Sequence, residues 1–167
     1  TILGKRFPGG QLILTGANSA VGLRSMPARW VFLDEVDAYP GDLDGEGDPI
    51  ALAEARTISF GHRSKLFLAS TPTVKGLSRI EREYELSDQQ RYHVPCPHCG
   101  ALQWLKFERL RWQPGRPETA RYVCEHCDEP IAERHKTEMM DEANGATWMP
   151  TAEPEMLERA RAAGIVG

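Results

Sequence analysis

The four cysteines of the chain form two Cys-x-x-Cys pairs, Cys96 with Cys99 and Cys124 with Cys127, separated by 24 residues. Each pair fits a tight turn that presents two thiolates to one metal ion, and the spacer lets the two turns face each other. Gly100, directly after the first pair, suits the left-handed backbone that such a turn often needs. The spacing therefore predicts a zinc ribbon in which four sulfurs hold one structural Zn²⁺.

Two alternatives use the same cysteines, namely two disulfides or a redox-active pair. Nothing in the sequence suggests the oxidising compartment in which disulfides persist, and redox proteins rarely carry two matched pairs. His98 and His126 lie inside the pairs, but four thiolates already complete a tetrahedral shell without them. Four thiolates and one Zn²⁺ would change the formal net charge of −4 to about −6.

A second group of reactive side chains ends an apolar run, because Trp30–Leu33 is followed directly by Asp34 and Glu35. An apolar strand followed by Asp-Glu is the Walker B pattern of P-loop nucleotide hydrolases, in which the strand aims both carboxylates at the nucleotide. We expect Asp34 to hold Mg²⁺ and Glu35 to orient or deprotonate the attacking water. The alternative is that the acids only keep a strand end solvated.

Small hydroxyl residues follow another apolar run, Lys65–Ala69. Ser70, Thr71 and Thr73 would lie at the same sheet edge as the two acids, where hydroxyls of helicase-like NTPases sense the γ-phosphate of ATP. Alternatively, they cap the next turn or helix. The two patterns together favour an ATP- and Mg²⁺-dependent hydrolase.

The phosphate-binding loop of such enzymes does not occur in the 167 residues. No GxxxxGK[ST] is present, since Gly4-Lys5 lacks the glycine loop and Thr15–Gly22 lacks the lysine. We therefore expect this chain alone to be inactive in ATP hydrolysis. Thr1 rather than a methionine opens the sequence, which suggests a fragment of a longer protein.

The segment from Asp34 to Glu54 carries eight acids and no Lys or Arg. The spacing of these acids does not match a calcium-binding loop. We expect most of them to form a solvated, glycine-rich loop without metal: Asp37, Asp42, Asp44, Glu46 and Asp48.

The elements that must position these groups follow from the apolar pattern. Gln11–Thr15, Trp30–Leu33 and Lys65–Ala69 are continuous rather than alternating, which predicts strands buried on both faces of a parallel sheet. Asp48 and Pro49 predict a helix start. The residues from 76 to 86 predict another helix, with an ion pair between Arg79 and Glu83.

The alternation of strands and helices predicts an α/β fold, a partial P-loop NTPase-like parallel sheet with helices, plus a small zinc-ribbon module. We expect residues 1–90 to be the C-terminal part of the ATPase domain, 91–134 the ribbon, and 135–167 a helical linker. Within the ribbon, strands are expected near 91–94, 103–107 and 121–123.

The composition excludes several other classes of protein. With 41% hydrophobic and 26% charged residues, the chain fits a globular domain rather than a disordered tail or a collagen-like repeat. No apolar stretch approaches the ~20 residues that span a bilayer. The first ten residues carry no secretion signal pattern.

The negative net charge is unusual for a DNA-binding protein. The stretch from Trp104 to Val123 is nevertheless locally basic, with five bases, two acids and interleaved aromatic residues. Such a combination can contact the nucleic acid backbone and stack on bases. We therefore predict that Arg109, Arg111 and Arg116 contact DNA. The alternative is that the aromatic residues form the ribbon core and the arginines are solvated.

The order of these motifs resembles the large terminase subunit of lambda-like tailed phages. The resemblance rests on residues 15–25, 27–40 and 70–73 and on the CPHCG…CEHC ribbon, and it covers nearly the whole chain. In that family an N-terminal ATPase domain drives DNA into a procapsid, and a C-terminal nuclease domain cuts concatemeric DNA. The resemblance implies that this chain is the second half of the ATPase domain, with the Walker A loop before Thr1 and the nuclease after Gly167.

The resemblance also implies roles and partners. Asp34 would be the Mg²⁺-associated acid and Glu35 the catalytic acid, while Ser70, Thr71 and Thr73 would form the coupling motif that contacts ATP. The implied partners are double-stranded DNA, the small terminase subunit and the procapsid portal, for an oligomer in the host bacterial cytoplasm.

Three arginines outside the ribbon have several possible roles. Arg24 lies in a stretch similar to a helicase motif and would contact DNA or another domain, unless it only forms a surface salt bridge. Arg56 and Arg63 are both candidates for an arginine finger, and the sequence does not select one. Two alternative functions remain open, a helicase-like NTPase with a zinc ribbon and a non-catalytic zinc-ribbon module that binds nucleic acid.

Overall fold

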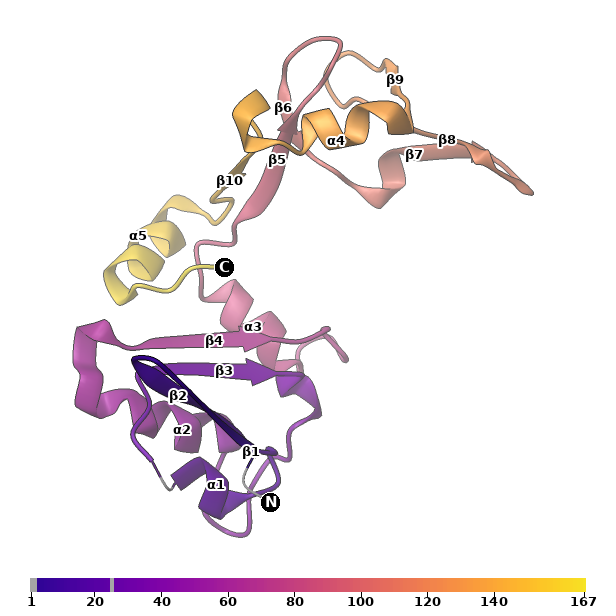
Figure 1. Cartoon of the computed structure of the whole chain (residues 1–167). Helices are drawn as coiled ribbons and strands as arrows, with labels where there is room; N and C mark the ends of the chain where they lie inside the picture. Colours follow the sequence, from indigo (N-terminus) through magenta and orange to yellow (C-terminus); the bar gives the residue numbers. More distant parts are fainter. Residues whose placement is uncertain (1–2, 25) are drawn as a thin grey trace. The chain divides into compact units, whose positions relative to one another are not determined.

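The computed structural model describes residues 3–24 and 26–167 of the chain (Figure 1). It contains two compact units, Thr1–Glu83 and Tyr84–Gly167. Each unit has its own hydrophobic core. Across the described residues, no helix is long and apolar enough to cross a membrane.

The first unit begins with a β-hairpin. Strands β1 (Leu3–Phe7) and β2 (Gly10–Leu14) pair antiparallel, and every residue in both strands is exposed. Gly9, in the tight turn, has a φ of 90°, which glycine adopts without steric cost. The prediction that Gln11–Thr15 is a buried strand of a parallel sheet is therefore wrong, because the Pro-Gly turn lets this run pair with its immediate neighbour instead.

The rest of the first unit is an α/β arrangement. Strands β3 (Trp30–Asp34) and β4 (Lys65–Ala69) are parallel, in register from Trp30 opposite Lys65 to Asp34 opposite Ala69. Parallel strands need a long crossover. The helices are α1 (Ala20–Arg24) before β3, η1 (Val36–Ala38), α2 (Pro49–Glu54) and η2 (Ala55–Arg63) in the crossover, and α3 (Arg79–Glu85) after β4. The predicted alternation of strands and helices is confirmed.

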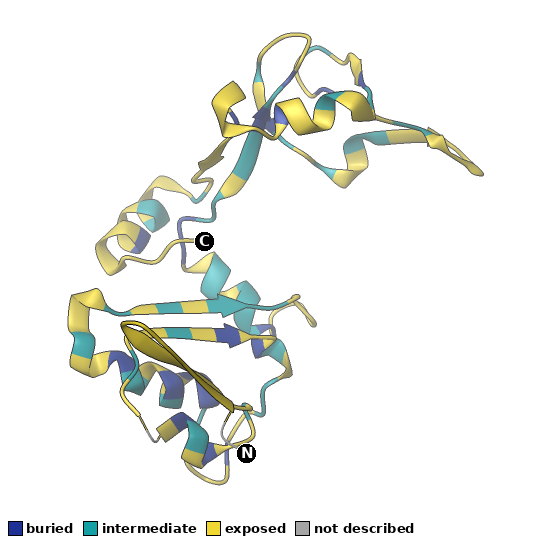
Figure 2. Ribbon diagram, in the orientation of Figure 1, coloured by how far each residue is buried: buried dark blue, intermediate teal, exposed yellow. Residues whose placement is uncertain are grey.

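Within the first unit, helices cover only one face of the β3–β4 pair (Figure 2). Leu33 packs into the core with residues of α1 and α2, whereas Phe32 is 71% and Phe67 58% exposed. The prediction that these strands are buried on both faces is wrong for the described part of the chain. Their continuous apolar runs place large side chains on both faces, and here helices meet only one of them.

The predicted helix starts hold only in part. Pro49 occupies the first turn of α2, as expected, but Asp48 makes no capping hydrogen bond. Its carboxylate pairs instead with Arg79, at 3.2 Å. The predicted ion pair between Arg79 and Glu83 is therefore wrong, because Arg79 faces the crossover and Glu83 pairs with Arg82.

The second unit contains two antiparallel sheets. One has the order β10-β5-β6, with β10 at Thr147–Met149, β5 at Arg91–Pro95 and β6 at Leu102–Trp104. The other has the order β7-β8-β9, with β7 at Leu110–Gln113, β8 at Arg116–Val123 and β9 at Pro130–Ile131. β7 falls in a stretch for which no strand is predicted, and β10 falls in the predicted helical linker.

Short helices connect and follow these sheets. They are η3 (Phe107–Arg109), η4 (Glu133–His135), α4 (Lys136–Met139), η5 (Glu142–Asn144) and α5 (Pro154–Ala163). The core of the unit is small, and two of its six buried members are cysteines. A core of this size rarely stabilises a domain without a disulfide or a metal. The residues in it are Val94, Cys96, Cys124, Ile131, Met139 and Ala146.

Candidate active site and metal centre

The parallel register of β3 and β4 brings the predicted acids and hydroxyls to one sheet edge. Asp34, the last residue of β3, lies opposite Ala69, the last residue of β4. The segments that follow both strands are joined there, because the backbone N–H of Asp37 donates to Ser70 Oγ at 3.2 Å. The carboxyl ends of parallel strands are where α/β proteins bind nucleotides.

Glu35 stands in a conformation that is unfavourable for its residue type. Its φ of 57° and ψ of 44° are left-handed, and its backbone N–H donates to Asp34 Oδ1 at 3.1 Å. A residue with a Cβ in this region costs roughly 1–2 kcal/mol relative to ordinary backbone. Strain of this kind concentrates at functional sites. A glycine would remove this cost, and Asp44, Gln89 and Asp128 stand in the same left-handed region.

Asp37 is a central residue of the site, although the sequence suggested only a solvated loop acid. Oδ2 accepts from the backbone N–H and the hydroxyl of Thr73, both at 3.1 Å, and Oδ1 accepts from the backbone N–H of Ile80 at 2.9 Å. Hydrogen bonds from Ser78, Ile80 and Thr73 lower the pKa of Asp37 from 3.8 to about 2. One carboxylate therefore joins the segment after β3 to the coupling hydroxyls and to the start of α3.

Arg79 holds the same segment from the other side. Its guanidinium donates to the carbonyl oxygens of Val36, Tyr39 and Pro40, at 3.2, 3.1 and 2.8 Å. Its side chain is only 17% exposed. Hydrogen bonds from a charged guanidinium are strong, so the turn that carries Glu35 is fixed at its C-terminal end. No pattern in the sequence predicts this role.

We expect Asp37→Asn to loosen this edge in a pH-dependent way. The lowered pKa of Asp37 means that its contribution to stability is complete above pH 3.8 and is lost as the pH falls towards about 2. Amide hydrogen exchange of Thr73 and Ile80 should be faster in the variant at pH 6, and the difference from the unsubstituted chain should disappear near pH 2. Equal exchange rates at pH 6 would contradict this role.

The other predicted residues of the first unit have local partners. Asp42 accepts from the backbone N–H groups of Gly45 and Gly47, at 2.7 and 2.9 Å, which closes a turn. Arg24 forms a salt bridge with Glu46 at 2.9 Å. Arg56 donates to the carbonyl oxygen of Arg24 at 2.6 Å.

Thr71 and Arg63 are the remaining hydroxyl and arginine candidates, and they differ in what they contact. Thr71 is exposed, and its carbonyl oxygen accepts from the Ser70 hydroxyl at 3.4 Å. The carbonyl oxygen of Arg63 accepts from Arg29 Nε at 3.0 Å, and its side chain is exposed. None of these contacts selects an arginine finger.

The four cysteines form a cluster in the second unit. Their sulfur atoms all lie within 4.8 Å of one another, with 3.9 Å between Cys96 and Cys127 and between Cys99 and Cys124. A tetrahedron with metal–sulfur bonds of 2.3 Å has edges of about 3.8 Å. All four lie in the described part of the chain and are free thiols, so the disulfide alternative does not describe this structure. The cluster could bind a metal ion.

The two cysteine turns are built alike. In the first, the N–H of His98 points to Cys96 Sγ at 3.4 Å, and in the second, that of His126 points to Cys124 Sγ at 3.4 Å. Each turn ends in a left-handed residue, Gly100 with a φ of 73° and Asp128 with a φ of 55°. Neither histidine side chain belongs to the cluster.

The cysteines of the cluster differ in how readily they ionise, and burial raises the pKa of Cys96. Burial raises the pKa of Cys124, but hydrogen bonds from the backbone N–H groups of Cys127 and His126 and from the neighbouring thiols together lower it by more, to about 6. For Cys127, the backbone N–H of Glu129 lowers the pKa, while burial and the neighbouring thiols raise it to about 12. A negative charge on one sulfur therefore disfavours ionisation of the neighbouring thiols. A bound divalent cation removes this repulsion. The donor set therefore fits the predicted zinc ion.

Arg109 supports the second cysteine turn. Its guanidinium donates to the carbonyl oxygens of Val123, at 3.0 Å, and Cys124, and forms a 2.7 Å ion pair with Asp128. Gln103, 2% exposed, accepts from the backbone N–H of Glu125 at 2.9 Å and links β6 to the same turn. The sequence predicts that Arg109 contacts DNA, but in the structure its guanidinium is bound to partners within the second unit.

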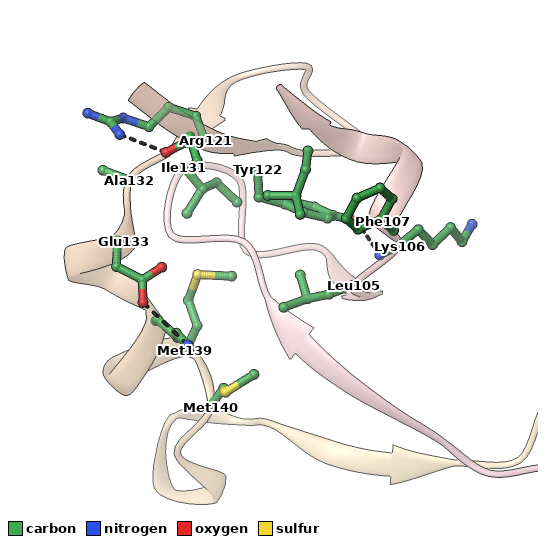
Figure 3. Close-up of a pocket in the computed structure, with 13 residues that line it drawn as sticks. Leu105, Lys106, Phe107, Arg121, Tyr122, Ile131, Ala132, Glu133, Met139 and Met140 are labelled. Atoms are coloured by element: carbon green, nitrogen blue, oxygen red, sulfur yellow. Dashed lines mark hydrogen bonds and ion pairs between the residues drawn. The ribbon is translucent and has the colours of Figure 1, made fainter. Parts of the chain in front are cut away.

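The second unit also has an apolar groove of about 400 Å³ (Figure 3). Leu105, Ile131, Met139 and Met140 contribute its apolar lining, and Arg121 lies on its border with its guanidinium extending away from them. None of the residues predicted from the sequence to do chemistry lines it.

Comparison with known proteins assigns the chain to a family. The family profile "Phage terminase large subunit gpA, ATPase domain" matches residues 1–148. "Terminase, large subunit" of Enterobacteria phage P21 is 35% identical over 153 residues, which are 87% of this chain and 23% of that protein. "Terminase, large subunit" of Escherichia phage lambda is 36% identical over 134 residues, 75% of this chain and 21% of that protein. No solved structure matches the chain.

The chain thus spans less than a quarter of the length of the curated relatives it matches. The family match covers β3, β4 and all four cysteines, and the order of motifs in the sequence agrees with it. The chain belongs to the ATPase-domain family of phage terminase large subunits.

Proposed function

We propose that these residues supply half of the ATP site of a DNA-packaging motor. The observation that carries the proposal is the sheet edge at which Asp34, Glu35 and the Ser70–Thr73 segment meet, held together by Asp37. In a motor of this class, ATP hydrolysis drives duplex DNA into a procapsid. The 167 residues contain no phosphate loop, so we propose that another part of a longer polypeptide provides it.

The residues of this edge have distinct roles in the proposed reaction. Asp34 would hold Mg²⁺, and bound Mg²⁺ would neutralise charge on the β- and γ-phosphates. Glu35 would accept a proton from the water that attacks the γ-phosphorus. The new bond from the water oxygen to phosphorus would form as the bond to the β–γ bridging oxygen breaks, and ADP would leave with that oxygen. Ser70 and Thr73 would sense the γ-phosphate, and Asp37 would keep them aligned with the acids. Thr71 is exposed and would contact nucleotide directly.

For the cysteine cluster we propose Zn²⁺ as the ligand. Cys96, Cys99, Cys124 and Cys127 would bind it as four thiolates in a closed tetrahedral site. Such an ion contributes folding free energy and takes no part in the reaction. The sulfur-only donor set, the near-tetrahedral sulfur spacing and the small surrounding core support this assignment.

The remaining expectations follow from the family. We propose that the full-length protein also carries an endonuclease domain, assembles as an oligomer and works in the host bacterial cytoplasm. Double-stranded DNA, the small terminase subunit and the portal of the procapsid would be its partners. The salt bridge between Arg24 and Glu46 favours a structural role for Arg24 over DNA contact.

The Asp34→Asn substitution tests the proposed ATP site. It should be made in a polypeptide that joins these residues to a phosphate loop. We expect DNA-stimulated ATP hydrolysis to fall by at least tenfold and to need more Mg²⁺, because the amide loses the charge that attracts the ion. Asp44→Asn is the matched control, since Asp44 is an exposed acid of the crossover that follows β3. Unchanged hydrolysis in Asp34→Asn would favour a non-catalytic, scaffolding role.

A further inference from the structure

The β7–β8 hairpin forms a projecting arm of the second unit (Figure 1). Its two strands place Arg111 and Arg121 directly opposite each other. Both arginines are exposed. Side chains that face each other across an antiparallel pair lie on the same face of the sheet, and like charges in this position are destabilising by a few tenths to about 1 kcal/mol.

Neither charge of this pair is compensated by a carboxylate within residues 3–24 and 26–167. Arg111 Nη1 donates to the carbonyl oxygens of Glu108 and Leu110, at 2.5 and 2.9 Å. Arg121 Nη1 donates to those of Ala120 and Glu118, at 2.7 and 3.3 Å. These contacts use one nitrogen of each guanidinium and leave both positive charges without a carboxylate partner in the described residues.

The other bases of this region have anionic partners. Arg116 pairs with Glu118 at 2.9 Å, Arg109 with Asp128 at 2.7 Å, and Lys106 with Glu125 at 2.7 Å. The local excess of positive charge seen in the sequence is thus concentrated on Arg111 and Arg121. Of the three ribbon arginines predicted to contact DNA, only Arg111 has no carboxylate partner among the described residues.

We propose that Arg111 and Arg121 form a clamp for the phosphate backbone of duplex DNA. The inference rests on the proposed packaging function, which supplies the anion. A guanidinium binds phosphate oxygens through two parallel N–H groups, and two guanidiniums on one face can grip one phosphate or two neighbours. Phosphate between them removes the repulsion that the hairpin otherwise carries. The contact reads no bases, as suits a motor that moves along any sequence.

The test uses the 167-residue chain and a fluorescent 30-base-pair duplex, with binding followed by anisotropy at several NaCl concentrations. In Arg111→Gln/Arg121→Gln we expect weaker binding and a slope of log K against log [NaCl] that is smaller by about 2, since each phosphate contact contributes roughly 0.9. Arg116→Gln, the matched control, should keep the slope of the unsubstituted chain. A duplex of different sequence should give the same values.

A second variant separates the clamp from a structural effect. Arg111→Lys/Arg121→Lys keeps both charges, so we expect it to retain the salt slope while binding more weakly, because lysine cannot bind bidentately. Circular dichroism and metal content should match the unsubstituted chain in every variant.

Three results would overturn the clamp. The first is an unchanged salt slope in the Gln double variant, and the second is an equal loss of DNA affinity in Arg116→Gln. The third is displacement of the duplex by an acidic peptide whose own binding is weakened by the substitutions. The same Gln double variant should also be made in the polypeptide that carries a phosphate loop. If DNA-stimulated ATP hydrolysis survives there while the salt slope is unchanged, the clamp is removed and the proposed function stands. Unchanged ATP hydrolysis in Asp34→Asn would instead remove the proposed function.

Discussion

Removal of zinc with a strong chelator should unfold the second unit and leave the first unit folded. The core of Tyr84–Gly167 has six buried members, and two of them are the proposed ligands Cys96 and Cys124. Structural zinc contributes about 10–16 kcal/mol in small zinc modules, far more than so small a core can replace. The core of the first unit contains none of the cysteines.

Amide hydrogen exchange measures this difference unit by unit. After chelation we expect protection to be lost throughout β5 to β9 and to persist in β3, β4 and α2. Cys124→Ser should give the same result without chelator. His98→Ala is the matched control, because His98 sits in a cysteine turn while its side chain lies outside the sulfur cluster. Native protein without bound zinc, or unchanged protection after chelation, would contradict the assignment.

The parts of the site that could be predicted from the sequence are those formed by residues close together in the chain. The Cys-x-x-Cys spacing fixes two local turns, and the structure brings all four sulfurs together. An apolar run that ends in Asp34 and Glu35 needs only a parallel neighbour to place it beside Ser70, and the register of β3 and β4 provides that neighbour.

The residues that the sequence did not reveal act across long stretches of chain. Asp37 bonds to Thr73 and Ile80, and Arg79 reaches back to carbonyl oxygens of the segment after β3. A carboxylate in an acidic, glycine-rich stretch resembles a solvated residue until its donors are known. Arg79 has a plausible helical partner at Glu83, which its contacts with the crossover outcompete.

The β1–β2 hairpin shows a different limit of sequence interpretation. Leu12, Ile13 and Leu14 form an apolar run like those of β3 and β4, yet all three are exposed and paired with β1. A short apolar run specifies a strand but not its partner. Here the Pro8-Gly9 turn decides the pairing, because a tight turn brings neighbouring runs together at little entropic cost.

The second large effect is expected for Glu35→Gln in the polypeptide that carries a phosphate loop. The amide side chain has the same size as the carboxylate and stands on the same left-handed backbone, but it cannot accept the proton of the attacking water. General base catalysis contributes typically 10²–10⁴-fold, so the rate of ATP hydrolysis should fall by about that factor. ATP and duplex DNA should still bind, because Asp34, Asp37 and the hairpin arginines are unchanged.

This substitution tests the central claim, that the edge formed by β3 and β4 is the hydrolytic half of an ATP site. The measurement is single-turnover hydrolysis of ATP, with nucleotide binding followed in the same samples and Asp44→Asn as the control. We predict that Glu35→Gln binds ATP normally and hydrolyses it at least a hundredfold more slowly, while Asp44→Asn matches the unsubstituted protein. Hydrolysis by Glu35→Gln at the unsubstituted rate would contradict the claim.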